Sequence, residues 1–216
     1  MKARAAAASE KNRADLLPLL KSAQLQADRN QPTEASHLFA EILAVEPDWP
    51  DALDAQFWFT VIQGDHALNQ TTLDEAFGHF QAAWTTVQRL LRAEPDALRS
   101  QRDLSISYER IGDVQVSQGD LPSALSSYKQ GLEIAQKLAA RDPGNTGWQI
   151  DLVISLWKLA SVLEQQRSPQ KREAGAKYQR ALEILRPLAV ENRLTAEQKN
   201  VPNRDPTESN KTENSQ

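Results

Sequence analysis

The second half of the chain contains an internal repeat, which restricts the folds that the chain can adopt. The stretch beginning at Asp103 returns 48 residues later at Asp151, and both copies start with Asp-Leu and carry Ile-Ser after one further residue. The similarity continues at an offset of 50 residues, where these positions correspond: Ala124, Tyr128, Leu132, Ile134, Leu138 and Ala139 with Ala174, Tyr178, Leu182, Ile184, Leu188 and Ala189. Because each stacked repeat buries its apolar face against its neighbours, the repeat predicts a solenoid rather than a globule.

Composition favours helix throughout the chain. Only 8 of the 216 residues are glycine, and no stretch alternates in the way a half-buried strand requires. The net charge of −4 gives no general attraction to nucleic acid or to an anionic membrane. The absence of cysteine excludes disulfides and thiolate chemistry, which fits a reducing compartment. We therefore expect an all-α protein that binds neither nucleic acid nor membrane.

The first residues are Ala-rich and charged, and they lack the apolar core of a secretory signal. No window approaches the length of a membrane-spanning helix. A soluble, cytoplasmic protein is the expectation. The start also resembles a linker inside a longer protein, so a fragment or a shortened form of a larger architecture is a further interpretation.

Prolines, glycines and capping residues divide the chain into about eight helices. Thr72 and Glu75 have the spacing of a capping box, and Asp120 stands where an N-cap is expected. The predicted helices span about 16–29, 33–45, 51–68, 72–92, 97–118, 121–140, 146–166 and 168 onward. The predicted domains are a lead-in helix or linker over 1–15, a repeat domain over 16–194 and a disordered polar tail over 200–216.

Small residues at fixed places in successive helix pairs resemble the tetratricopeptide repeat family. Two helices whose axes approach closely need Ala or Gly at the crossing point. The first pair offers Ala23 and Ala35, followed by Phe39 and Pro47; Ile42 departs from the pattern. The later pairs carry the matching residues Ala76, Phe80, Ala83, Gly112, Ala124, Tyr128, Gly131, Ala160, Ala174, Tyr178 and Ala181. In the second pair the first small residue falls on either Gln63 or Gly64.

The second helices of the later pairs extend about two turns beyond the usual length, because the terminating prolines come late, at Pro95 and Pro143. This resembles the long-helix variants of kinesin light chains and of bacterial multidomain proteins. The resemblance covers about four pairs over 16–192 and implies a right-handed superhelical solenoid.

The resemblance implies that the first helix of each pair lines a concave groove. The corresponding residues are Leu20, Gln24, Phe57, Thr60, Ile106, Glu109, Asp113, Trp157, Ser161 and Glu164, with Leu17 and Ile154 beside them. This surface is apolar with acidic points, which suits a peptide with hydrophobic anchors and basic residues.

Some of these residues also have a structural interpretation. Trp157 follows an apolar residue and can pack on the next helix instead. Glu109 and Asp113 flank Arg110 and suit a solvated face. Phe57, next to Trp58, is more typical of a core than of a binding anchor.

The sequence offers little for catalysis or metal binding. Glu34 and His37 have the spacing of a helical di-iron motif, but no second copy exists. No glycine-rich phosphate loop is present. The basic residues between Arg167 and Arg180 are interspersed with Gln and Glu, which favours a solvated face. We therefore expect no enzymatic activity and no cofactor.

The resulting hypothesis is a non-enzymatic scaffold that binds a protein or peptide in its groove. The alternative is a ligand-sensing regulatory module of a larger signalling protein. The long last helices offer a surface for self-association.

Overall fold

The computed structural model describes residues 2–165 and 168–190, without the side chains at 2–5, 168–170 and 190. Within these residues there are eight helices and no strand, which confirms the all-α prediction. The helices are α1 (Lys2–Asp28), α2 (Pro32–Val45), α3 (Pro50–Asn69), α4 (Leu73–Ala93), α5 (Leu98–Ser117), α6 (Leu121–Arg141), α7 (Thr146–Glu164) and α8 (Ser168–Val190). None of the described helices is long and apolar enough to cross a membrane.

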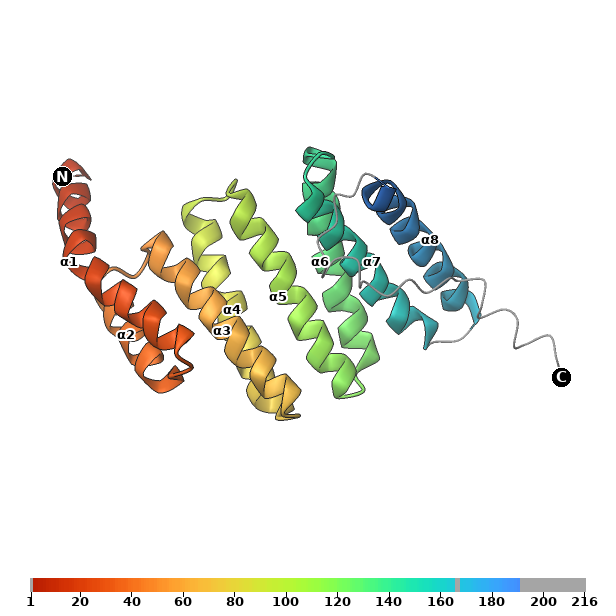
Figure 1. Cartoon of the computed structure of the whole chain (residues 1–216), viewed down its shortest axis with the longest axis horizontal. Coiled ribbons are helices and arrows are strands. Elements are labelled where there is room, and N and C mark those ends of the chain that lie inside the picture. Colours follow the sequence, from red (N-terminus) through yellow and green to blue (C-terminus); the bar gives the residue numbers. More distant parts are fainter. Residues whose placement is uncertain (1, 166–167, 191–216) are drawn as a thin grey trace. The chain divides into compact units, whose positions relative to one another are not determined.

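The chain forms two compact units, Met1–Asp103 (unit 1) and Leu104–Gln216 (unit 2), and the boundary falls within α5. In unit 1, α1 packs on α2 and α3 packs on α4; in unit 2, α7 packs on both α6 and α8. These neighbours run antiparallel in Figure 1. Both units are therefore built from successive helices joined by short turns, which is the helix-pair arrangement that the sequence predicts.

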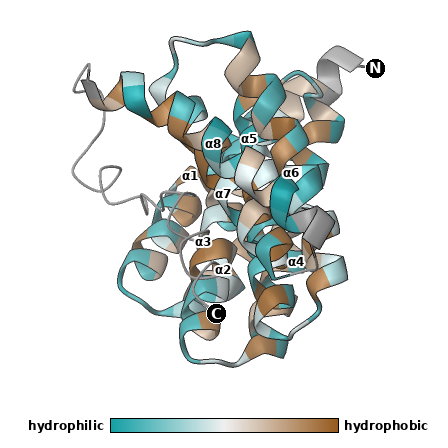
Figure 2. Ribbon diagram, turned by 90° about the vertical axis from the view of Figure 1, so that its right-hand side faces the viewer, coloured by the Kyte–Doolittle hydropathy of each residue, from teal (hydrophilic) through white to brown (hydrophobic). Residues whose placement is uncertain are grey.

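Each unit buries its own apolar cluster. In unit 1 the cluster around Phe39 joins α1, α2 and α3; in unit 2 the cluster around Tyr128 joins α6, α7 and α8. Figure 2 shows hydrophobic and hydrophilic residues alternating along the helices, as expected of helices buried on one side only. The predicted helix boundaries agree with the observed ones to within about two residues, apart from the start of α1.

Glycines mark the closest approach of paired helices. A Cβ added at Gly64 would lie closer than 3.0 Å to the Phe80 ring, and one at Gly112 would lie equally close to the Tyr128 ring. Ala23 and Ala35, the corresponding small residues of the first pair, are both fully buried. Gly64, not Gln63, is therefore the small residue of the second pair, which settles the register of α3.

The second helices of the later pairs have the predicted long form. α2 has 14 residues, whereas α4 and α6 have 21 each and α8 has 23. An additional two turns allow the later second helices to reach further along their partners.

One predicted cap is confirmed and one is wrong. Asp120 accepts a hydrogen bond from the Ser123 backbone N–H at 3.1 Å, as an N-cap does. Thr72 makes no such bond, because its hydroxyl donates to the Ala67 carbonyl of the preceding helix at 3.0 Å. Thr71, which precedes it, has a φ of 61°, in the left-handed region that β-branched residues seldom adopt. The tight turn between α3 and α4 therefore uses the hydroxyl to close α3.

The lead-in over 1–15 is not a separate element. α1 continues through Pro18 without a break, and its first half is attached to the end of α2. The Glu46 carboxylate accepts hydrogen bonds from Ser9 at 2.6 Å and Asn12 at 2.9 Å, and Arg13 lies 3.5 Å away. These contacts keep the pKa of Glu46 below its ordinary value, with the Ser9 and Asn12 bonds as the main causes. The predicted tail over 200–216 and the end of the predicted repeat domain lie outside the described residues.

Candidate functional site

The residues predicted to line a groove differ in accessibility. Leu20 and Phe57 are only 3% and 0% exposed, and Thr60 is also buried, with its hydroxyl on the Gln56 carbonyl at 2.7 Å. Gln24 is exposed. The half-buried ones are Ile106, Glu109, Asp113, Trp157, Ser161 and Glu164. The assignment of Leu20, Phe57 and Thr60 to an accessible groove is therefore wrong.

The error on α3 is one of register. Placing the small residue at Gln63 puts Phe57 on the open side of the helix, whereas the observed contact at Gly64 replaces it with Trp58. Thr60 is not explained in this way, because Val61, which follows it, is also buried. Trp58 is then half-buried at the surface, and its ring meets the fully buried Phe57 edge-on at 5.2 Å. The side chain available to a partner is thus Trp58.

Trp58 lines a pocket of about 540 Å³ in unit 1, which we call the α1–α3 pocket. Its lining comes from α1 and α3, the turn after α1, and one residue of α2: Gln24, Ala27, Asp28, Asn30, Phe39, Asp54, Ala55, Trp58, Phe59, Ile62 and His66. Of the predicted groove residues, Gln24 belongs to it. The first helices of two successive pairs therefore share one pocket.

The floor of the α1–α3 pocket is aromatic and its edge is aliphatic. Phe39 and Phe59 are buried, with ring centroids 5.5 Å apart, so the floor is held rigidly by the core. Ile62 is 48% exposed and supplies the aliphatic edge. A rigid apolar floor with an exposed aliphatic edge is the kind of surface that receives an apolar anchor.

The polar residues of the α1–α3 pocket include two acids. Asp28 is exposed, and Asp54 is half-buried. Arg99 contacts Asp54 at 2.8 Å, yet burial raises the pKa of Asp54 above its ordinary value. The Arg99 side chain is itself 71% exposed, so this ion pair lies open to water and is readily exchanged. The pocket therefore combines apolar walls with negative charge.

In unit 2 the predicted acidic residues point to a neighbouring helix. The Lys158 ammonium lies 2.5 Å from both carboxylate oxygens of Asp113, and the Tyr128 hydroxyl donates to the same carboxylate at 2.7 Å. The Ser155 hydroxyl donates to Glu109. We call these five residues the α5–α7 network. They hold α5, α6 and α7 together.

Burial shapes the titration of the α5–α7 network. It raises the pKa of Glu109 to about 7, because the lowering effects of Lys158 and Ser155 are weaker than the desolvation. The Tyr128 pKa is raised by burial and by the Asp113 carboxylate. Lys158 also lies 5.8 Å from the centre of the Tyr128 ring. Glu109 and Asp113 are thus part of the scaffold. The prediction that they lie on a solvated face, which rests on the adjacent Arg110, is wrong.

Trp157 packs as its structural interpretation predicts. Its ring meets that of Tyr178 edge-on, with centroids 6.1 Å apart, and its indole N–H is buried without a hydrogen-bond partner among the described residues. Ser161 donates to the Lys158 carbonyl at 2.8 Å. The Glu164 carboxylate accepts a hydrogen bond from the Tyr178 hydroxyl at 3.3 Å. These three α7 residues therefore contribute first to packing within unit 2.

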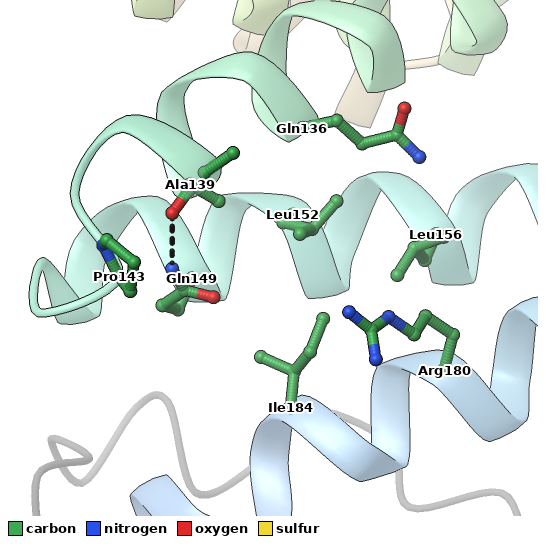
Figure 3. Close-up of a pocket in the computed structure, with 9 residues that line it drawn as sticks. Gln136, Ala139, Pro143, Gln149, Leu152, Leu156, Arg180 and Ile184 are labelled. Carbon is green, nitrogen blue, oxygen red and sulfur yellow. Dashed lines mark hydrogen bonds between the residues drawn. The ribbon is translucent and has the colours of Figure 1, made fainter.

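A second pocket, of about 390 Å³, lies in unit 2 and does not follow from the sequence (Figure 3). Leu152 and Leu156 of α7 and Ile184 of α8 supply its apolar walls, and the Arg180 side chain points into it. Gln149 donates to the Ala139 carbonyl at 2.9 Å along one side. Sequence periodicity cannot reveal this pocket, because the same leucines are expected in any core.

Among the described residues, no three His, Asp or Glu side chains are grouped so that they could hold a metal ion. Glu34 and His37, the pair with di-iron spacing, are both exposed on α2.

Comparison with known proteins gives similar structures but no matching family. No family model matches the sequence, and no curated protein matches it. The chain is similar to the nearly identical TPR-like repeats of a putative kinesin light chain from Podosopora anserina, at 19% identity and a TM-score of 0.36, over 79% of this chain and 86% of that chain. It is also similar to the flexible tandem repeat domain of a component of bacterial cellulose synthase, at 18% identity and a TM-score of 0.32, over 91% and 97%.

Proposed function

We propose that the chain is a non-catalytic scaffold that binds a peptide segment of a partner protein in the α1–α3 pocket. The observation that carries the proposal is the pocket itself, in which Trp58 and Ile62 stand accessible above a floor of buried aromatic rings. Apolar pockets with a few polar groups at fixed places are the usual form of a binding site. Helix-pair scaffolds bind by displaying such surfaces, which requires no reacting group.

The pocket favours a particular kind of peptide. Its apolar part can take one aromatic or long aliphatic side chain, which would bury the exposed face of Ile62 and one side of Trp58. Asp28 and Asp54 favour Lys or Arg next to this anchor. Arg99 already shows how a guanidinium meets Asp54, at 2.8 Å and from an exposed position. A partner arginine could replace it in a similar geometry.

The predicted groove residues of unit 2 offer less to a partner than the sequence suggests. Glu109 and Asp113 are engaged by Ser155 and Lys158, so they are poorly placed to select basic residues. Ile106, Trp157, Ser161 and Glu164 remain half-buried, and their contribution to binding stays a prediction. We therefore assign specificity to the α1–α3 pocket.

The test is selection of random displayed peptides on the full chain, followed by measurement of Kd for synthetic copies by fluorescence polarisation. We expect an aromatic or aliphatic anchor next to Lys or Arg. Ile62→Glu should weaken binding about tenfold or more, because it places a charge against the apolar anchor of the peptide, which costs about 2 kcal/mol. Asp28→Asn should weaken it less and reduce its dependence on salt.

Val45→Glu is the matched control. Val45 is 51% exposed on α2, also an aliphatic residue on a helix, and does not line the pocket. It should leave Kd unchanged. Peptides that bind the wild type and Ile62→Glu equally well, or a selection that yields no apolar anchor, would contradict the proposal.

A further inference from the structure

In the α5–α7 network, the half-buried Glu109 lies close to a second acid, Asp113, and to one cation, Lys158. Glu109 of α5 faces Ser155, Lys158 and Asp151 of α7, and it is also close to Asp113 of its own helix. From α6, Tyr128 faces it, and Gly131 packs against its side chain. Arg110 contacts Asp113 at 3.6 Å. Two further carboxylates, Asp113 and Asp151, therefore raise the pKa of Glu109, and Lys158 lowers it.

Both cations contact Asp113 rather than Glu109. The Lys158 ammonium contacts both Asp113 oxygens at 2.5 Å, and Arg110 approaches the same carboxylate. Within the described residues, Glu109 has the Ser155 hydroxyl as its direct partner and makes no ion pair in direct contact. The Ser155 hydroxyl donates to the Glu109 carboxyl and by itself favours the ionised form, but one hydroxyl offsets less of the desolvation cost of that charge than a cation in direct contact does.

We propose that Glu109 is a pH-responsive lock between α5 and α7, closed when its carboxyl is protonated and loosened when the carboxyl ionises. In the closed form, the acid and the Ser155 hydroxyl form a neutral hydrogen-bonded pair beside the Asp113–Lys158 ion pair. Ionisation places a second negative charge next to Asp113 inside the packed helices. The charge is relieved when α7 separates from α5 and water reaches Glu109.

The sign of the pH dependence follows from burial. The Glu109 pKa is raised to about 7 in the folded protein, above the ordinary value of 4.5. Between these two values the unfolded or opened form loses its proton while the closed form keeps it. Stability from the lock is therefore complete below about pH 4.5 and declines as the pH rises toward 7. Near neutral pH about half of the Glu109 carboxyls are ionised, which is where a regulatory change of pH would act.

The direct test is a pH titration of the full chain with ¹³C-labelled glutamate side chains, followed by NMR. We expect one carboxyl resonance with a midpoint near 7, and its absence from the spectrum of Glu109→Gln identifies it. A Glu109 midpoint near the ordinary value of 4.5 would overturn the proposal. Lys158→Met removes a nearby positive charge and should move the midpoint higher; an unchanged midpoint would also contradict it.

The opening itself is measured by amide hydrogen exchange in α7, corrected for the intrinsic effect of pH. Protection around Ser155 should fall by about tenfold or more between pH 5 and 8, because the pKa difference between closed and open forms exceeds one unit. Glu109→Gln should abolish this change. Glu133→Gln is the matched control, because Glu133 is an exposed α6 residue of the same unit paired with Lys137, and it should retain the wild-type change.

If Glu109→Gln fails to fold, Ser155→Ala identifies the Glu109 resonance by a shift of its midpoint, and the fall in protection should move to higher pH with it. Loss of the hydroxyl removes a bond that lowers the Glu109 pKa, so the midpoint should rise. A loss of protection with pH that is equal in Glu109→Gln and wild type would show that another group is responsible, and it would overturn the lock.

Discussion

Unit 1 and unit 2 are built from the same kind of helix pair but use the side of their first helices differently. In unit 1, α1 and α3 leave the α1–α3 pocket open, with Ile62 exposed and Trp58 accessible. In unit 2, α5 and α7 are joined by the α5–α7 network, in which Asp113 pairs with Lys158 and Glu109 accepts a hydrogen bond from Ser155. The shared pattern of small residues therefore encodes how helices pair, and it does not determine whether their outer side is available to a partner.

Each unit has a carboxyl group between two helices, and the surroundings shift the pKa of the two groups in opposite directions. Glu46 receives two hydrogen bonds and a nearby guanidinium, which lower its pKa, whereas burial raises that of Glu109. The difference lies in the number of donors that reach each carboxyl. Unit 1 therefore loses stability from this junction in acid, and unit 2 loses it as the pH rises toward neutrality.

The largest expected effect concerns the ion pair of unit 2. Lys158→Met leaves Arg110, at 3.6 Å, as the remaining cation in contact with the Asp113 carboxylate among the described residues, and we expect a loss of about 3 kcal/mol in the free energy of unfolding. Urea denaturation followed by circular dichroism measures it. The control is Lys137→Met, which removes an exposed i,i+4 pair and should cost less than about 0.5 kcal/mol. Equal effects would mean that the network is no more important than a surface pair.

Replacing the glycine at a close helix contact should lower the free energy of unfolding by a similar amount in both units. Gly64→Ala and Gly112→Ala each place a methyl group closer than 3.0 Å to an aromatic ring carbon, and we expect a loss of about 2 kcal/mol. Tyr128 cannot turn away without losing its bond to Asp113. Gly78→Ala, with nothing within 4 Å, is the control and should stabilise α4 by about 0.5–1 kcal/mol. A gain at either crossing would show that the helices are not closely packed there.

Substitutions at Glu46 and its partners should lower stability less than those above. The contribution of Glu46 should be lost in acid, whereas that of Glu109 is lost as the pH rises. Asn12→Ala removes one hydrogen bond and should cost about 1 kcal/mol at pH 7. The contribution of Glu46 is present above its ordinary pKa and is lost as the pH falls through its lowered value. Thermal melts between pH 3 and 7 should therefore show a smaller acid-side loss in Glu46→Gln than in wild type. If Glu46→Gln and wild type lost the same stability in acid, the two units would not differ in their pH dependence as proposed.

The smallest expected effect on stability is at the proposed binding surface. Ile62→Glu changes an exposed side chain and should alter the free energy of unfolding by less than about 0.5 kcal/mol. The same substitution should nevertheless weaken peptide binding about tenfold or more. A large loss of stability would show that Ile62 belongs to the core, and the open character of unit 1 would then be wrong.

Much of the fold can be predicted because its signals are local. Prolines and turn residues place the helix ends, and the assignment of Asp120 as a cap is correct. That of Thr72 is not, because its hydroxyl binds the Ala67 carbonyl behind it instead of the amides ahead of it. The continuous course of α1 through Asp15 is not predicted either, since its support comes from Glu46, which is 37 residues beyond Ser9.

The candidate site is harder to predict, because a shift of one residue on a helix turns a side chain by about 100°. The ambiguity between Gln63 and Gly64 is enough to exchange Phe57 for Trp58. For Glu109 and Asp113 the sequence shows their own helix and an adjacent arginine, but the partners lie on α7, more than 40 residues away.

The helical class, the helix ends and the small residues at which paired helices meet can be read from the chain, because they depend on propensity, capping and the volume of single side chains. The packed helices settle which acids are bound within the scaffold, which aromatic side chain reaches the surface and where a pocket remains. Those outcomes depend on which side chains from distant helices reach the same place and on how much water they exclude there.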